Sequence, residues 1–371
     1  MRVRIEGIDR RPLLLPLRVP FVIASGEVTT TRAVEIEASV SSDGVTALGL
    51  GEAAALPPVT HEDVDDIVNR VDQAVRVLRA AEGDIAPEHA KTLIFALDRA
   101  FEGAPVARAG VEVAILDGIA RLEKVPLYQW LRPSATHQTS FLTDITLSIG
   151  AIEPMLEEAR SWHGRGFRCF KVKVGRDVDH DMRALEAIAK SLSDVTFRID
   201  ANAGFCAHDA LTLLGAIERL SLRVECFEQP CAASDLDAMA EVTRASKVPV
   251  IADESIRTLR DLQAIIAARA AHGVNLKLSK MGGALHALRI GVAAQTAGMR
   301  LMMGGMVESR LGMTAAAHVA AALGGVDFAD LDTAFLLTAE AHEGGYTSEG
   351  PHLTLTGAKG LGVRRLLRQP S

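Results

Sequence analysis

Two lysines stand two residues apart in a short stretch, Phe-Lys-Val-Lys-Val-Gly at residues 170–175, where apolar and basic side chains alternate. If the stretch is a β-strand, Lys171 and Lys173 point to the same face, because successive side chains of a strand alternate between its two faces. Two neighbouring ammonium groups repel each other, and this lowers the pKa of at least one of them. The stretch is therefore either one wall of a site that moves protons or an edge strand with its lysines in water.

Three carboxylates stand where apolar runs end, in the phrases Ile-Asp-Ala-Asn, Phe-Glu-Gln-Pro and Ala-Asp-Glu-Ser. They are Asp200, Glu228 and Asp253. In a barrel of parallel strands, the C-terminal ends of the strands form the functional face. Carboxylates that converge there repel one another, and a hard divalent cation would neutralise them. Oxygen ligands without His or Cys favour Mg²⁺. The other interpretation is that each acid caps the next helix or pairs with a nearby Arg or Lys.

A further lysine, Lys277, lies in the run Val-Asn-Leu-Lys-Leu-Ser-Lys-Met-Gly-Gly. By strand parity Lys277 shares a face with Asn275, whereas Lys280 lies on the other face or beyond the strand end. If the face of Asn275 points into a barrel, Lys277 stands across that barrel from Lys171 and Lys173, with the three carboxylates between. The predicted site is thus a metal ion flanked by lysines that face each other.

This combination suits the removal of a proton from a carbon atom next to a carboxylate. Such a carbon acid has a very high pKa, and a metal ion that binds the carboxylate stabilises the enediolate formed on deprotonation. With a lysine on each face, one lysine can remove the proton while the other returns a proton from the opposite side, which inverts the carbon. A single lysine base would suit an elimination or a cycloisomerisation equally well.

The elements that carry these residues recur at a nearly constant interval. Candidate strand-end residues follow one another every 24 to 29 positions. They are Thr146, Lys171, Asp200, Glu228, Asp253, Lys277, Gly305 and Asp330. Apolar residues at helical spacing fill the segments between them, for example at 207–220 and 284–297. The sequence therefore predicts an α/β fold with a (β/α)₈-type barrel, that is, a modified TIM barrel.

The N-terminal part has a different order, with strands first and helices afterwards, which predicts an α+β capping domain. Strand-like runs occupy 5–15, 33–40 and 47–54, and helices are predicted at about 88–103 and 106–123. The second of these helices carries the apolar residues Val106, Ala109, Val113, Ile115 and Leu116.

The connections between these elements also carry signals. The polar, glycine-containing stretch 18–31 predicts a mobile loop. Residues 60–63 open a further predicted helix, which precedes the other two and has Thr60 as its candidate N-cap. We expect a capping domain over 1–125, a catalytic barrel domain over 126–332 and a C-terminal tail over 333–371. The tail contains a glycine-rich hairpin signal, so we expect it to pack back on the capping domain and complete it.

Composition limits the partners. The net charge is −7 without a block of like charges, which argues against nucleic acid and membrane partners. The chain has no run of 18 apolar residues and no apolar signal region at its start, and its four cysteines show no CxxC spacing. We therefore expect a cytoplasmic location and reduced thiols. The Ala-rich segment 315–322 is expected on the barrel exterior, where it would suit the interface of a homo-oligomer.

Taken together, the motifs resemble the enolase superfamily, in particular its muconate-lactonising subgroup, over nearly the whole chain. The matching phrases are Lys171-Val-Lys173, Asp200-Ala-Asn202, Glu228-Gln-Pro230, Asp253-Glu-Ser255 and the run that holds Lys277. The resemblance implies Lys173 and Lys277 as the acid/base pair, with Lys171 near the substrate carboxylate. It implies that Mg²⁺ is held by Asp200, Glu228 and Asp253.

Within that family the phrase Asp330-Leu-Asp332 resembles the Asp-x-Asp motif by which dipeptide epimerases hold the α-ammonium group of their substrate. Two carboxylates that face a pocket with no obvious cation need a cationic partner, and a free amino terminus supplies one. Otherwise one acid is a cap or pairs with Arg310 or the tail. Thr146 and Met306 match positions that line the dipeptide pocket in those enzymes.

The resemblance implies a Mg²⁺-dependent dipeptide epimerase, an isomerase that inverts the α-carbon of the C-terminal residue of a dipeptide. The reaction passes through an enediolate by 1,1-proton transfer between two lysines. The alternative is a muconate-type cycloisomerase or o-succinylbenzoate synthase with the same metal site. Some dipeptide epimerases carry an arginine at the tip of the loop over the pocket, where this chain has Ser25-Gly26-Glu27. This difference favours small or apolar side chains, unless Glu27 faces the pocket and selects a cationic one.

Overall fold

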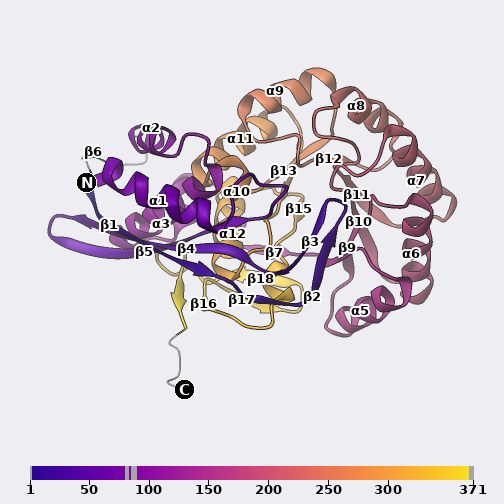
Figure 1. Ribbon diagram of the computed structural model, residues 1–371, viewed down its shortest axis with the longest axis horizontal. Helices are drawn as coiled ribbons and strands as arrows, with labels where there is room; N and C mark the ends of the chain where they lie inside the picture. The colour runs from indigo at the N-terminus through magenta and orange to yellow at the C-terminus, as the bar shows by residue number, and fades with distance from the viewer. Residues whose placement is uncertain (1, 80–82, 85–89, 367–371) are drawn as a thin grey trace.

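A parallel eight-stranded sheet forms the centre of the computed structural model, which describes residues 2–79, 83–84 and 90–366. Strands that follow one another in the chain are neighbours in the sheet, and a bridge between Thr143 and Ala329 joins its two edges (Figure 1). The predicted (β/α)₈-type barrel is therefore confirmed. Its strands are β8 (Ile145–Leu147), β9 (Cys169–Lys173), β10 (Thr196–Asp200), β11 (Val224–Glu228), β12 (Val250–Ala252), β13 (Gly273–Leu276), β14 (Arg300–Met303) and β15 (Phe328–Ala329).

Helices cover the outside of the barrel, as the arc in Figure 1 shows. Their starts have local causes: Asp177 accepts hydrogen bonds from two backbone N–H groups, and Thr258 forms a capping box with Asp261. A 3₁₀-helix, η2 (Thr333–Leu336), follows β15. The α-helices are α5 (Ile152–Gly164), α6 (Val178–Ser191), α7 (Ala207–Arg219), α8 (Leu236–Ala245), α9 (Leu259–Ala268), α10 (Leu278–Met281), α11 (Ala284–Thr296) and α12 (Arg310–Leu323).

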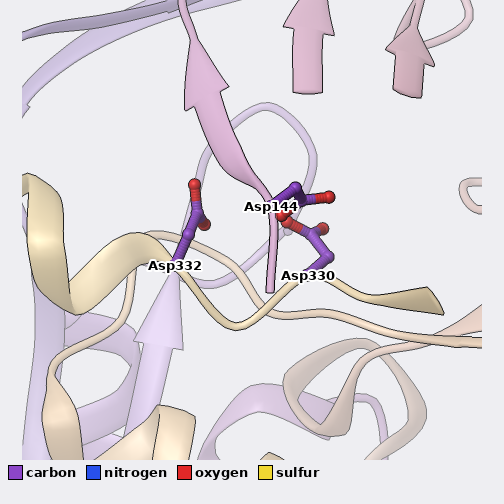
Figure 2. A group of neighbouring side chains, drawn as sticks. All are labelled: Asp144, Asp330 and Asp332. Atoms are coloured by element: carbon purple, nitrogen blue, oxygen red, sulfur yellow. The ribbon is translucent and has the colours of Figure 1, made fainter. Parts of the chain in front are cut away.

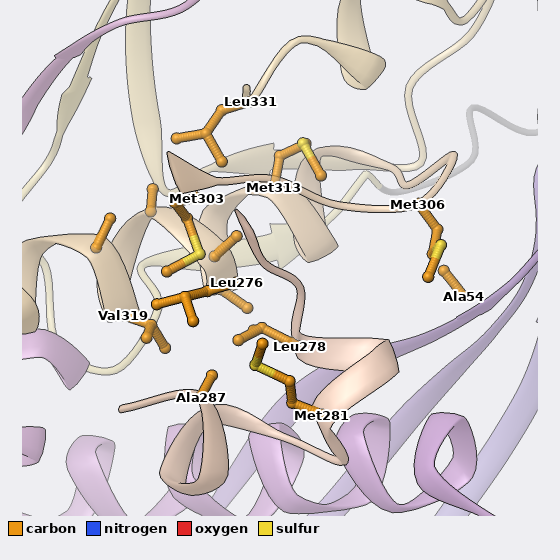
Figure 3. Packing of buried hydrophobic residues seen from close by; sticks show 14 of the residues in the cluster. Ala54, Leu276, Leu278, Met281, Ala287, Met303, Met306, Met313, Val319 and Leu331 are labelled. Carbon is orange, nitrogen blue, oxygen red and sulfur yellow. The ribbon is translucent and has the colours of Figure 1, made fainter. Parts of the chain in front are cut away.

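Side chains of the barrel strands alternate between the helical layer and the inside of the barrel. On β13, Leu276 points outward, into the apolar layer that contains Met303 of β14 and Val319 of α12 (Figure 3). Its neighbour Asn275 points inward and donates from Nδ2 to Glu228 at 2.8 Å. Strand parity therefore orders the polar residues of the barrel interior.

A second unit built from the N-terminal residues covers one side of the barrel (Figure 1). Its helix α3 lies so close to β5 that a Cβ atom on Gly51 would be 2.1 Å from the carbonyl oxygen of Gly110. A Cβ atom on Gly110 would in turn lie 2.8 Å from Ala53, so the two elements can meet this closely only because both positions are glycine. The sheet is ordered β5 (Val45–Ala55), β4 (Arg32–Ser42), β1 (Arg2–Leu13), β6 (Gly83–Asp84), and the helices are α1 (Val64–Arg79), α2 (Ala90–Ala100), α3 (Pro105–Leu122) and α4 (Leu127–Leu131).

The stretch 18–31, predicted as a mobile loop, is mostly an antiparallel hairpin of β2 (Pro16–Ile23) and β3 (Gly26–Thr30). The prediction of a loop was wrong, because Val19 and Pro20 are exposed and interrupt the alternation that would have indicated a strand; the mobility of the stretch stays a prediction.

Three other predictions concern the helices. Thr60 does not cap α1, which begins at Val64; its Oγ1 accepts from the backbone N–H of Leu56 instead. The first two positions of the helix predicted at 88–103 lie outside the described residues. The Ala-rich segment 315–322 is buried by its own chain, because α12 packs against α4, α11 and β5. It is therefore not an exterior surface for an oligomer.

The tail contacts both parts of the molecule. The hairpin of β17 (Tyr346–Glu349) and β18 (His352–Leu355) pairs with β7 (Ser140–Leu142) before the first barrel strand. The pair β16 (His342–Gly344) and β19 (Val363–Arg365) meets β4, where Glu35 accepts from both His342 and Arg365 at 2.6 Å. The limits proposed for the three domains remain predictions. No helix among the described residues is long and apolar enough to cross a membrane.

Candidate active site

Both lysines of β9 point into the barrel and are buried, with exposed fractions of 1% for Lys171 and 5% for Lys173. Lys173 lies directly opposite Asp200 of β10, and Asp200 lies opposite Glu228 of β11. The ammonium group of Lys173 is 2.6 Å from Asp200. The interpretation of an edge strand with lysines in water is therefore wrong, because β9 is flanked by strands on both sides.

Lys171 is surrounded by carboxylates. Its Nζ lies 2.7 Å from Glu228, 2.7 Å from Asp330 and 3.1 Å from Asp200. Burial by itself lowers the pKa of this lysine, but the negative charges of the three acids outweigh burial and raise its pKa well above the usual value. The expected repulsion by Lys173 therefore does not lower the pKa of Lys171, because the surrounding acids have the larger effect. The sequence alone could not show how many acids surround this lysine.

Asp253 stands one residue beyond β12 and binds two lysines. Lys277 Nζ lies 2.8 Å from Asp253 Oδ2, and Lys280 Nζ contacts the other carboxylate oxygen. Burial would lower the pKa of Lys277, but Asp253 and Glu228 raise it above the usual value. Burial does lower the pKa of Lys280. Lys277 thus points inward as predicted, and Lys280 reaches the same carboxylate from α10, beyond the strand end.

The three predicted metal ligands are buried at the ends of adjacent strands, and their oxygen donors suit Mg²⁺. Burial and the charge of Asp200 raise the pKa of Glu228 to about 7. Burial acts in the same direction on Asp253, but Lys277 and Lys280 lower its pKa well below the usual value. Their negative charges, which lysine ammonium groups partly balance in this structure, and their oxygen donors suit a divalent cation.

A different trio of acids has carboxylate oxygens within 4.8 Å of one another among the described residues: Asp144, Asp330 and Asp332. Asp144 precedes β8, and the other two follow β15 (Figure 2). Asp144 pairs with Arg198 at 2.9 Å, and Asp330 pairs with Lys171. Asp332 has no ion-pair partner within the part of the chain that the structure describes.

The surroundings of Asp332 separate the interpretations that the sequence left open. Its Oδ2 accepts from the backbone N–H of Thr146 at 2.6 Å, while its Oδ1 is buried and accepts no hydrogen bond from any described residue. Its side chain does not cap η2. Arg310 lies 3.4 Å from Glu340 instead. Pairing of Asp332 with Arg310 is therefore wrong.

Seven predicted residues line one cavity: Thr146, Lys171, Lys173, Asp253, Lys277, Met306 and Asp330. Asp200, Glu228 and Asp332 lie behind its wall, in contact with lining residues. Met306 lies beside Ala54 of β5, where the N-terminal unit meets the barrel (Figure 3).

Replacing Arg198 by methionine should destabilise the protein by about 3–5 kcal/mol. The guanidinium of Arg198 is nearly buried and balances Asp144, which is fully buried beside Asp330. Without it, Asp144 would be an unpaired charge. Urea unfolding measures the loss. The double variant with Asp144→Asn should recover part of it, and a double variant as unstable as Arg198→Met alone would contradict this explanation.

Comparison with known proteins shows the family to which the chain belongs. Residues 154–365 match the family described as enolase C-terminal domain-like, and residues 8–131 match the mandelate racemase/muconate lactonizing enzyme N-terminal domain. The chain belongs to the enolase superfamily. It is 32% identical to the L-Ala-D/L-Glu epimerase of Bacillus subtilis, with 97% of each chain covered. It is 35% identical to a hydrophobic dipeptide epimerase of Citrifermentans bemidjiense, with 94% of each covered.

A solved structure of this superfamily has the same fold. The dipeptide epimerase of Enterococcus faecalis, complexed with Mg and the dipeptide L-Leu-L-Tyr, matches with a TM-score of 0.87 and 29% identity. The match covers 98% of this chain and 99% of that one. The resemblance to the enolase superfamily inferred from the sequence motifs is thus confirmed.

Four charged residues of this superfamily member's site were not predicted: Asp144, Arg198, Glu254 and Lys280. Parity could have found the first two, because Asp144 stands two residues before Thr146 and Arg198 two before Asp200. Lys280 could not be found in this way, since α10 turns it back toward Asp253.

Proposed function

We propose that this enolase-superfamily enzyme is a Mg²⁺-dependent dipeptide epimerase that inverts the α-carbon of the C-terminal residue. The proposal rests on Asp332, a buried carboxylate without a cationic partner among the described residues, beside a cavity that contains two lysines on opposite barrel strands. The epimerases among its relatives support the same function.

The polar groups of the cavity suggest how a dipeptide binds. Its free ammonium group would pair with Asp330 and Asp332, because Asp330 has Lys171 as its partner whereas Asp332 has no cationic partner among the described residues. Lys171 would lie near the substrate carboxylate. Asp200, Glu228 and Asp253 would hold Mg²⁺, which when bound would withdraw charge from that carboxylate and stabilise an enediolate. Thr146 and Met306, which line the cavity, would contact the dipeptide.

Lys173 and Lys277 would move the protons. Three strands separate β9 from β13 on either side of the closed sheet, so the two lysines stand on opposite walls. One lysine would remove the α-proton, and the other would donate a proton to the opposite face of the planar intermediate. Asp200 and Asp253 hold the two ammonium groups at 2.6 and 2.8 Å and so orient them toward the cavity.

Deuterium exchange tests the function. Incubation with a set of dipeptides in D₂O should exchange the α-proton of the C-terminal residue, read by mass spectrometry. The double substitution Asp330→Asn/Asp332→Asn should lower kcat/KM by about 100-fold or more, because the substrate ammonium loses its counter-charge. The alternative, a cycloisomerase or o-succinylbenzoate synthase, needs no ammonium site, and unchanged activity of the double variant would favour it. The dipeptide epimerases among the relatives do not favour that alternative.

The affinity for dipeptides should also depend on pH. Burial, followed by the charge of Asp330, raises the pKa of Asp332 to about 6. Above that pH Asp332 is charged and attracts an ammonium group, whereas below it the carboxyl is neutral. We therefore expect KM to rise about tenfold for each pH unit below about 6. Steady-state kinetics at saturating Mg²⁺ measure this, and Asp332→Asn should remove the dependence.

A cytoplasmic location and a homo-oligomer are further parts of the proposal. The four cysteines are free, which agrees with reduced thiols. Size-exclusion chromatography with light scattering would test the oligomeric state.

A further inference from the structure

Hydrogen bonds attach the hairpin of β2 and β3 to the barrel beside the cavity. The guanidinium of Arg176 donates to the carbonyl oxygen of Ile23 at 2.7 Å, and the N–H of Ile149 donates to that of Val22 at 3.1 Å. The hairpin, which forms a wall of the cavity, is therefore held by residues that follow β8 and β9. On this wall the ring of Phe21 has its centroid 5.5 Å from the ammonium nitrogen of Lys173.

Strand parity divides the hairpin into two faces. Phe21 and Ile23 line the cavity that contains the lysines. Val22 and Glu27, which are paired across the hairpin, line a separate groove on its outer side, next to α5. Glu27 therefore does not face the substrate cavity, and the selection of a cationic side chain by Glu27 is ruled out.

The wall that faces the lysines is apolar. Leu56 and Val59 from the segment after β5 continue the surface of Phe21 and Ile23, and Met306 joins it from the barrel. Phe21, Ile23, Leu56 and Met306 are each less than 9% exposed.

No cation of the cavity is left for a charged substrate side chain. Among the described lining residues the cations are Lys171, Lys173 and Lys277, and each is bound to a carboxylate of the site. A carboxylate side chain buried there would lack a partner, which is strongly unfavourable. Glu254, the remaining acid of the lining, accepts from Asn202 at 3.1 Å through one oxygen, while its other oxygen is buried and accepts no hydrogen bond from a described residue.

We propose that the enzyme selects dipeptides whose inverted residue has an uncharged, apolar side chain, and that Phe21 is the main residue that determines this specificity. The inference rests on the proposed function, since Phe21 lies beside the lysine that would exchange the α-proton. A substituent on the reacting carbon would contact the ring of Phe21, which favours an aliphatic or aromatic group and disfavours a charge.

Exchange of the α-proton in D₂O with L-Ala-L-Leu, L-Ala-L-Glu and L-Ala-L-Lys tests the specificity of the unmodified protein. We expect kcat/KM for L-Ala-L-Leu to exceed both others by about 100-fold. A preference for L-Ala-L-Glu or L-Ala-L-Lys would overturn the inference while leaving the epimerase function intact. No exchange with any dipeptide would instead overturn the function itself, and the inference with it.

Two arginine substitutions on opposite faces of the same hairpin test the role of Phe21. Phe21→Arg should raise the ratio of kcat/KM for L-Ala-L-Glu to that for L-Ala-L-Leu by about 100-fold, because it supplies the missing cation. Val22→Arg adds the same charge to the outer face and should leave the ratio unchanged. Phe21→Ala, which adds no charge, should lower kcat/KM for L-Ala-L-Leu by about tenfold. Equal ratios in the two arginine variants, or no loss in Phe21→Ala, would overturn the assignment.

Discussion

Replacing Lys173 or Lys277 by alanine is expected to abolish epimerisation, with a loss of at least about 10³-fold in kcat. Inversion needs one group to remove the α-proton and another to return a proton from the opposite face, so either loss stops the complete reaction. Each variant should still exchange the α-proton of one substrate enantiomer, the one whose proton faces the remaining lysine. The two variants should therefore exchange opposite enantiomers in D₂O.

The structure indicates that both variants will fold. Asp200 keeps Lys171 at 3.1 Å after loss of Lys173, and Asp253 keeps Lys280 after loss of Lys277. Neither change leaves a buried carboxylate without a cation, so urea unfolding should show a loss much smaller than that expected for Arg198→Met. Equal residual exchange of both enantiomers in both variants would refute the picture of opposed lysines.

The barrel and much of its site could be predicted because the chemistry recurs with the fold. One βα unit follows another at nearly equal length, so Asp200, Glu228 and Asp253 had to meet at the same rim. Parity along a strand then placed Lys171 and Lys173 on one face. These inferences need only local geometry and the closure of a parallel sheet.

What could not be predicted depends on contacts between segments distant in the chain. The protonation of Lys171 depends on three acids from three other elements, of which Asp330 is 159 residues away. The hairpin at 18–31 is ordered by the barrel beneath it, and its own sequence contains exposed Val19 and Pro20. The Ala-rich α12 is buried because α4, α11 and β5 cover it, which its composition alone cannot reveal.

Removal of Mg²⁺ by a chelator should stop α-proton exchange, and Asp253→Asn should weaken Mg²⁺ binding by about 100-fold in calorimetry, because an amide cannot neutralise the cation. Binding should also release protons. Burial and the charge of Asp200 raise the pKa of Glu228 to about 7, and a divalent cation bound at this carboxylate would lower that pKa and displace the proton. The Mg²⁺ affinity should therefore increase with pH, and the binding enthalpy should vary with the ionisation enthalpy of the buffer.

A matched substitution decides which group of acids holds the metal ion. Asp332→Asn removes one negative charge from the other trio, whose oxygens lie within 4.8 Å of one another and could themselves hold a cation. If Mg²⁺ binds at Asp200, Glu228 and Asp253, this change should alter the affinity by less than about fivefold while it weakens dipeptide binding. Equal losses of Mg²⁺ affinity in Asp253→Asn and Asp332→Asn would instead place the ion, and not the substrate ammonium, beside Asp332. The unpaired oxygen of Asp332 would then bind a metal ion, and Asp332 would no longer support a dipeptide as the substrate.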